Sequence, residues 1–92
     1  MTLQNMTVSF IGSGVMAEAM IKGLLTQKLL TADQIYAADP NEDRGAELVS
    51  RYGLHYSTDN AEAARKADIL ILAIKPQMLP HVVSQLRRVA HE

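Results

Sequence analysis

Residues 8–17 constrain the fold of this 92-residue chain more than any other segment, and they read Val-Ser-Phe-Ile-Gly-Ser-Gly-Val-Met-Ala. Val8–Ile11 is a short run of strand-forming residues that stops at Gly12, with a second glycine at Gly14. Apolar residues then recur at every fourth position, the period of an amphipathic helix: Met16, Met20 and Leu24. A strand that turns through a glycine loop directly into a helix is typical of the start of a βαβ unit.

The rest of the chain continues the alternation of strand and helix. Short runs of strand-forming residues, bounded by turn residues, predict three further strands: Ile35–Ala38, His55–Ser57 and Ile69–Ala73. Apolar spacing and start signals predict three further helices: one that begins at Pro40-Asn41 and ends at Gly53, one over Asn60–Lys66, and one that carries Val82, Val83, Leu86 and Val89. Thr31–Gln34 is expected to be a turn, and Asp59 with Glu62 a capping box.

Four strands, each followed by a helix, predict a Rossmann-type α/β fold. Because crossovers between parallel strands are right-handed, we expect the strand order 3-2-1-4 with helices on both faces. The aliphatic run Ile69–Ala73 is typical of a central strand covered on both faces. The sheet nevertheless stops before a fifth strand, which would leave strand four as an exposed aliphatic edge. The chain is therefore expected to be a fragment, or to have a partner that completes the sheet.

Composition limits the classes of partner. Nine basic and ten acidic residues give a net charge of −1, so we expect neither nucleic acid nor an anionic membrane as a partner. The longest apolar run, residues 69–74, is too short to span a bilayer, and residues 1–7 lack the pattern of a signal peptide. The chain has no cysteine, which fits a cytoplasmic location. Three scattered histidines are expected in ordinary surface roles rather than at a metal site: His55, His81 and His91.

The glycine loop carries the clearest chemical signal. It reads Gly12-Ser13-Gly14-Val15-Met16-Ala17, a G-x-G-x-x-A pattern placed between a strand and a helix. Gly12 permits the tight turn, Gly14 lets a pyrophosphate approach the backbone, and Ala17 lets the helix pack on the strand. The free N–H groups and the positive dipole end of the helix would then face the phosphates. The alternative is an ordinary glycine-rich turn in an unrelated α/β protein.

Two further positions fit a nicotinamide dinucleotide. Asp39 follows Gly14 by 25 residues, close to the spacing of the carboxylate that binds the adenosine ribose, and it would favour NAD(H). The alternative is a turn residue or helix cap before Pro40. Arg44 could reach a 2′-phosphate, or it could lie on a solvated helix face. Lys75 follows strand four at the switch point of the sheet, where it would border the nicotinamide half, unless it is an ordinary surface lysine.

Other prominent side chains have structural explanations from the sequence. Helical spacing places Met16 and Met20 in the core. Glu18 lies in the first turn of its helix, where a carboxylate interacts favourably with the helix dipole. Arg87 and Arg88 are expected on a solvated face.

Three ordered stretches resemble the pyrroline-5-carboxylate reductases. They are Phe10–Met20 followed by Gly23-Leu24-Leu25, then Thr58-Asp59-Asn60, then Ala67–Gln77 with its Lys-Pro pair. The resemblance covers nearly the whole chain. It implies NADP or NAD as cofactor and the reduction of 1-pyrroline-5-carboxylate to L-proline in proline biosynthesis.

The resemblance also implies roles for individual residues, all of them in cofactor binding and none catalytic. All six residues of the loop Gly12–Ala17, Ser13 and Ala17 included, are predicted to bind the cofactor, and Gly12, Gly14, Val15 and Met16 would line its pyrophosphate. Asp39 would occupy the 2′-hydroxyl or 2′-phosphate position. Asn60 would reach the adenosine ribose. The nicotinamide ribose would be flanked by three residues: Ala73, Lys75 and Pro76. Val15 and Asp39 depart from the residues common in the family, and Asp39 leaves the choice between NAD and NADP open.

The family also has a helical domain that dimerises and carries the substrate site, and residues 1–92 lack it. The resemblance therefore implies a partial N-terminal NAD(P)-binding domain that is inactive alone, from a homo-oligomeric enzyme that acts on a small imine. Two alternatives remain: a dehydrogenase of the 3-hydroxyacid or 6-phosphogluconate type, and a nucleotide-binding module without catalysis.

Overall fold

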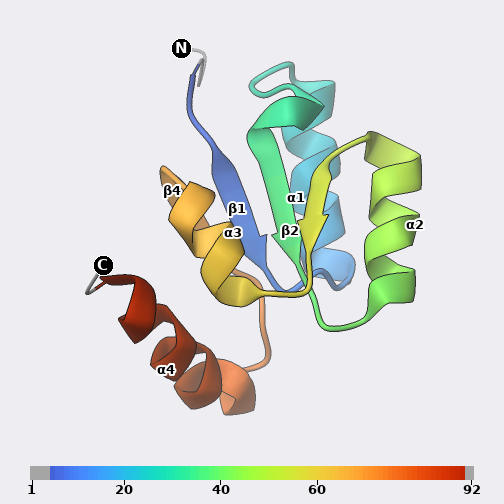
Figure 1. The fold of residues 1–92 in the computed structure, drawn as a ribbon. Coiled ribbons are helices and arrows are strands. Elements are labelled where there is room, and N and C mark those ends of the chain that lie inside the picture. Colours follow the sequence, from blue (N-terminus) through green and yellow to red (C-terminus); the bar gives the residue numbers. More distant parts are fainter. Residues whose placement is uncertain (1–4, 91–92) are drawn as a thin grey trace.

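The computed structural model describes residues 5–90, with side chains up to Arg87. Strands and helices alternate within it in this order: β1 (Val8–Ile11), α1 (Val15–Thr26), the 3-10 turn η1 (Ala32–Gln34), β2 (Ile35–Ala38), α2 (Glu42–Tyr52), β3 (His55–Ser57), α3 (Asn60–Lys66), β4 (Ile69–Leu72), the 3-10 turn η2 (Pro76–Met78) and α4 (Leu79–Ala90). The strands are parallel, in the order β3-β2-β1-β4. Helices α1 and α2 cover one face of the sheet, and α3 and α4 lie on the other (Figure 1). The predicted fold and strand order are confirmed.

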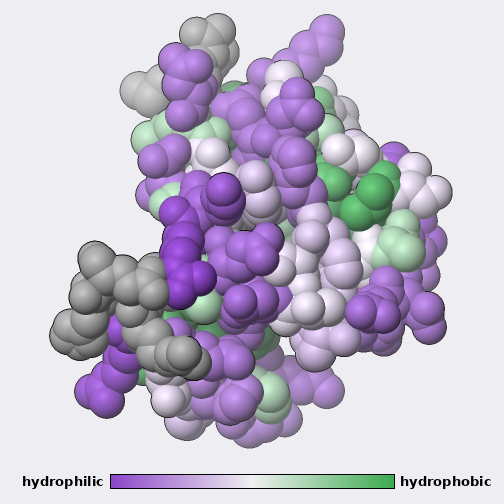
Figure 2. Space-filling model, in the orientation of Figure 1, coloured by the Kyte–Doolittle hydropathy of each residue, from purple (hydrophilic) through white to green (hydrophobic). Residues whose placement is uncertain are grey.

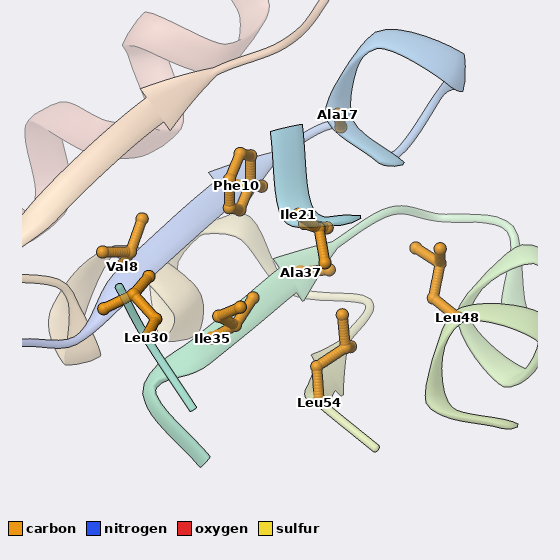
Figure 3. Close-up of a cluster of buried hydrophobic side chains, with 9 residues drawn as sticks. All are labelled: Val8, Phe10, Ala17, Ile21, Leu30, Ile35, Ala37, Leu48 and Leu54. Carbon is orange, nitrogen blue, oxygen red and sulfur yellow. The ribbon is translucent and has the colours of Figure 1, made fainter. Parts of the chain in front are cut away.

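Side chains alternate across β1 and divide the core into two clusters. Val8 and Phe10 point toward α1 and α2. Figure 3 shows their cluster, which also contains Ala17, Ile21, Leu30, Ile35, Ala37, Leu48 and Leu54. Ile11 belongs to a smaller cluster on the opposite face, with Ala38, Ala63 and Val82. Ser9 is fully buried, and its hydroxyl donates to the Ala63 carbonyl at 2.7 Å, which ties α3 to the sheet.

Strand β4 is the edge of the sheet opposite β3. Ile69 and Ile71 are half-buried against the larger cluster, whereas Leu70 and Leu72 are 37% and 42% exposed. The prediction of a strand covered on both faces is therefore wrong for the described residues, because α3 and α4 leave one face of β4 uncovered. The prediction of an exposed aliphatic edge is confirmed. Strand β4 ends at Leu72, one residue earlier than predicted, although the Ala73 N–H still donates to the Ile11 carbonyl at 2.8 Å.

Helix α2 begins and ends at residues with local signals. Asn41 caps its start, since the Asn41 side chain accepts a hydrogen bond from the Asp43 N–H at 3.0 Å. Pro40 and Asn41 therefore precede the helix, and the first helical residue is Glu42. Gly53 ends the helix as predicted, with a left-handed backbone (φ 73°).

The prediction of a capping box at Asp59 and Glu62 is wrong, since the described residues show only a simple N-cap there. Asp59 caps α3 by accepting from the Ala61 N–H at 2.9 Å, two positions along the chain rather than three. The reciprocal box instead forms at η1, where Gln34 Oε1 accepts from the Thr31 N–H at 3.0 Å. The segment predicted as a simple turn is thus a capped 3-10 turn.

Helix α4 runs from Leu79 to Ala90 and contains the four apolar positions predicted for it. Val82 is buried, and Leu86 is half-buried against the smaller cluster. Val83 is 43% exposed, so the apolar face of α4 is narrower than its sequence predicts. The Val89 side chain lies outside the described residues, as does that of Arg88.

The surface over α2 and α3 is mostly hydrophilic, with hydrophobic residues gathered in small patches (Figure 2). Within residues 5–90, no helix has the length and apolar character needed to cross a membrane. The same part of the chain contains no cluster of His, Asp or Glu suited to a metal ion. His91 lies outside it.

Candidate functional site

A cavity of about 380 Å³ lies at the carboxyl ends of the strands. Its walls come from the loop after β1, the ends of β2 and β3, the start of α3, the loop after β4, and α4. The lining residues are Ile11, Gly12, Ser13, Gly14, Ala38, Asp39, Pro40, Thr58, Asn60, Ala73, Ile74, Lys75, Met78, His81, Val82 and Gln85. β1 lies between β2 and β4 in the sheet, so the cavity is at the point where the strand order reverses. Open parallel sheets bind their ligands at this position.

Gly12 is required by the close packing of two loops. Its φ of 91° lies in the region that favours glycine, and its N–H donates to the Ala38 carbonyl at 2.9 Å. A methyl group on Gly12 would collide with the carbonyl oxygen of Ala73 and lie 2.8 Å from Ile74 Cγ2. The glycine therefore lets the loop after β4 pass directly beside the loop after β1.

Gly14 borders open space instead. It is the N-cap of α1, and a methyl group built on it would have no atom within 4 Å. The first helical hydrogen bond of α1 runs from the Glu18 N–H to the Gly14 carbonyl at 3.0 Å. The N–H groups before Glu18 have no partner within the helix, so this end of α1 presents donors and a positive dipole end.

The residues after Gly14 differ from one another in burial. Ala17 is fully buried in the larger cluster, as its predicted packing role requires. Val15 and Met16 are 86% and 73% exposed, and neither side chain lines the cavity. The placement of Met16 in the core is wrong, because its side chain lies on the exposed side of the first turn of α1, whereas Ala17 of the same turn packs in the cluster. Met20, one turn later, packs on the larger cluster as predicted.

Asp39 binds the glycine loop. Its Oδ2 accepts hydrogen bonds from the Ser13 hydroxyl at 2.8 Å and from the Ser13 N–H at 3.2 Å. Its Oδ1 accepts from the Asn41 N–H at 2.8 Å. Asp39 is thus a turn residue, while the N-cap of α2 is Asn41. Its carboxylate holds the loop after β1 against the end of β2, where it lines the cavity.

A charged network supports the loop from the side of α2. Glu18 accepts hydrogen bonds from Tyr52 Oη at 2.6 Å, Arg44 Nη2 at 2.7 Å and Arg51 Nη1 at 2.9 Å. The hydrogen bond from Tyr52, followed by that from Arg44, lowers the pKa of Glu18 from 4.5 to about 2. The same bond to the Glu18 carboxylate raises the pKa of Tyr52. Glu18 therefore does more than interact with the helix dipole, the role that the sequence predicted, because it also joins α1 to α2 through these three hydrogen bonds.

Arg44 also contacts the loop itself. Its Nε donates to the Ser13 carbonyl at 2.6 Å, and its Nη2 lies 3.3 Å from the Gly14 carbonyl. Its side chain is 19% exposed. The prediction of a solvated helix face is wrong for Arg44, because four acceptors on the loop, α1 and α2 surround its guanidinium.

Helix α4 forms the opposite wall. Asn60 at the start of α3 donates from Nδ2 to Gln85 Oε1 at 2.7 Å, which joins α3 to α4. His81 and Met78 line the cavity beside them. The sequence did not single out His81 and Gln85 of α4 as wall residues, and His81 was given an ordinary surface role. The usable signal was their position on the helix that follows the switch-point strand.

Of the eleven residues predicted to bind the cofactor, the structure brings seven together in the cavity wall: Gly12, Ser13, Gly14, Asp39, Asn60, Ala73 and Lys75. Four are not in the wall: Val15, Met16, Ala17 and Pro76. Lys75 is exposed at the N-cap of η2, and Pro76 is the first residue of that turn.

The parallel sheet, the strand–glycine-loop–helix start and the cavity at the switch point define an α/β domain of the Rossmann class. The chain belongs to the family described as NADP oxidoreductase coenzyme F420-dependent, whose model matches residues 7–92.

Individual relatives are pyrroline-5-carboxylate reductases. The chain is 40% identical over 85 residues to that of Methanosarcina acetivorans, covering 92% of this chain and 32% of the relative. It is 41% identical over 87 residues to that of Haemophilus influenzae, covering 95% of this chain and 31% of the relative. The predicted resemblance is confirmed, and the chain spans about a third of the length of these relatives.

Two solved structures of reductases have folds similar to that of this chain. The pyrroline-5-carboxylate reductase from Coxiella burnetii superposes with a TM-score of 0.89 at 27% identity, over 97% of this chain and 33% of that chain. The Plasmodium falciparum pyrroline carboxylate reductase with NADP bound has a TM-score of 0.78 at 23% identity, over 94% of this chain and 30% of that chain. The second likeness supports the fold.

Proposed function

We propose that this chain binds NADH or NADPH as the dinucleotide-binding part of a pyrroline-5-carboxylate reductase, which reduces 1-pyrroline-5-carboxylate to L-proline in proline biosynthesis. The observation that carries the proposal is the open space beside Gly14, at the N-terminus of α1 and in the wall of the switch-point cavity. The names of the relatives support the reaction.

The residues present fit such a cofactor. Backbone N–H groups from Gly14 to Met16 would hold the pyrophosphate, so the exposed side chains of Val15 and Met16 are compatible with their predicted positions. Gly14 has the free space that a phosphate needs, which a methyl group would fill. Ser13 would act through its place in the loop, which Asp39 holds by two hydrogen bonds.

The ribose and base would lie deeper in the cavity. Asp39 would accept hydrogen bonds from the adenosine ribose, and Asn60 would contact the same sugar from the start of α3. Ala73, Lys75 and Pro76 would flank the nicotinamide ribose at the end of β4. When bound, the reduced nicotinamide supplies a hydride, and this chain's residues hold the cofactor in position.

The imine must be held at near-attack distance from the cofactor. We assign no catalytic residue in the cavity, and we propose that a helical domain outside residues 1–92 supplies the substrate site. Residues 1–92 would then be the N-terminal dinucleotide-binding domain, without turnover by themselves. The share of the relatives' length that the chain covers, 32% and 31%, supports this division.

We further propose a homo-oligomeric protein in the cytoplasm. The exposed aliphatic edge at Leu70 and Leu72 supports association, because an open strand edge pairs readily with another chain. The absence of cysteine supports a reducing compartment.

Titration of the chain with NADH and with NADPH, followed by nicotinamide fluorescence, tests the proposed binding. Gly14→Ala should weaken both affinities at least tenfold, because its methyl group would occupy the phosphate space. Gly23→Ala is the matched control: it lies in the same helix, also faces open space, and is outside the cavity wall. Binding of neither cofactor to the native chain, or an equal loss of affinity in both variants, would contradict the proposal.

A further inference from the structure

Arg44 fixes the orientation of two peptide groups in the glycine loop. The carbonyl of Ser13 and the N–H of Gly14 belong to one planar trans peptide, so they point in opposite directions. The carbonyl of Gly14 and the N–H of Val15 are related in the same way. Because Arg44 binds both carbonyls from the side of α2, both N–H groups are directed away from α2.

The loop is held from two sides at Ser13. Asp39 accepts from the Ser13 N–H and hydroxyl, and Arg44 donates to the Ser13 carbonyl. Ser13 is 1% exposed, so these bonds are shielded from water. The combination leaves the peptides around Ser13 little freedom to rotate.

Two carboxylates hold the Arg44 guanidinium in the position where it binds the loop carbonyls. Glu18 and Glu47 accept from its two terminal nitrogens, each at 2.7 Å. Glu18 holds a lowered pKa and stays ionised at neutral pH. A 2′-phosphate approaching Arg44 would meet these two carboxylates, and Asp39 would repel it from the end of β2.

We infer that Arg44 is a positioning residue for the proposed cofactor, which orients the loop N–H groups toward the pyrophosphate and does not bind a 2′-phosphate. This inference rests on the proposed dinucleotide function. If Arg44 has this role, its loss weakens the binding of NADH and the binding of NADPH equally, since both cofactors carry the same pyrophosphate.

The test compares Arg44→Met with Arg51→Met in the same chain. Arg51 also binds Glu18 and Glu47 but is 52% exposed and has no bond to the loop among the described contacts. The readouts are the dissociation constants of NADH and NADPH and the thermal midpoint of each variant. Arg44→Met should lower the affinity for each cofactor about tenfold, equivalent to roughly 1.4 kcal/mol of binding free energy. Arg51→Met should change neither dissociation constant by more than about twofold.

Arg44→Lys separates orientation from charge. A lysine keeps the cation beside Glu18 but lacks the planar fork that reaches both loop carbonyls. Arg44→Lys should lower the affinity for both cofactors to a value between those of the native chain and of Arg44→Met, without unfolding the chain. If Arg44→Met does not fold, Arg44→Lys therefore provides the test. Unchanged affinity in Arg44→Lys would overturn the inference.

The remaining outcomes are distinct. A selective loss of NADPH in Arg44→Met would make Arg44 a phosphate ligand and overturn the inference while the proposed function stands. Equal losses in Arg44→Met and Arg51→Met would assign the effect to the Glu18 network as a whole and also overturn it. If the native chain binds neither cofactor, the proposed function itself fails.

Discussion

Gly45 lies in the fourth position of α2, where alanine would ordinarily stabilise a helix by about 0.5–1 kcal/mol. The structure predicts the opposite sign. A methyl group at Gly45 would overlap the ring of Tyr56, whose hydroxyl donates to the Asp39 carbonyl at 2.6 Å. The ring is half-buried against the larger cluster, so it must leave its place for Gly45→Ala to fold.

The cost follows from what the ring loses. Re-exposing about half of the roughly 200 Å² that an aromatic side chain buries costs about 2.5 kcal/mol at roughly 25 cal/mol per Å². The lost hydrogen bond adds about 1 kcal/mol. After the helical gain is subtracted, Gly45→Ala should destabilise the chain by about 2.5–3 kcal/mol, a fall in thermal midpoint of roughly 10–24 °C for a domain of this size.

Urea denaturation followed by circular dichroism measures the change. Gly23→Ala is the control, because the same substitution in α1 meets open space and should stabilise. In a Tyr56→Ala background the obstacle is gone, so Gly45→Ala should become neutral or stabilising. A stabilising Gly45→Ala in the native background would refute the packing of Tyr56 on α2.

Three further predictions concern the loop network. Gly12→Ala should destabilise the chain by about 3 kcal/mol, because it combines a left-handed backbone with a collision against the Ala73 carbonyl; urea midpoints within about 1 kcal/mol of native would contradict this. Asp39→Asn should cost about 1–2 kcal/mol by weakening the bonds to Ser13, and should raise the affinity for NADPH relative to NADH; an unchanged cofactor ratio in fluorescence titration would argue against a ribose contact. Because the folded pKa of Glu18 is about 2 against 4.5 unfolded, its contribution to stability is complete above about pH 4.5 and is lost as pH falls toward 2. Glu18→Gln should therefore flatten the stability profile in that window, and parallel profiles would exclude the network.

The fold was largely predictable because its signals are local. Three of the strands, β1, β2 and β4, are short and mainly apolar runs beside a glycine or an aspartate, and the right-handed crossover rule restricts the orders that four parallel strands can adopt. The glycine loop was equally accessible, since the roles of Gly12 and Gly14 follow from their spacing. The burial of β4 was predicted wrongly, because its aliphatic sequence is typical of a strand covered on both faces, whereas the described residues cover only one of its faces.

The rest of the site depends on contacts between distant segments. Glu18 and Arg44 are 26 residues apart, and each alone is consistent with a helix surface. The contact between Gly45 and Tyr56 joins α2 to β3 and has no periodic signature. The wall formed by α4 arises from how that helix packs on α3, which a one-dimensional apolar pattern does not specify.

Backbone amide shifts on addition of NADH or of NADPH report where a dinucleotide contacts the chain, so they show whether the glycine loop and α4 form its binding site. We expect the largest shifts on the loop N–H groups from Gly12 to Ala17 and on His81 and Gln85 of α4. The carboxyl half of α1, with Gly23, should be nearly unaffected. If neither cofactor causes shifts at saturation, or if the shifts are concentrated away from the switch-point cavity, the proposed dinucleotide site is wrong.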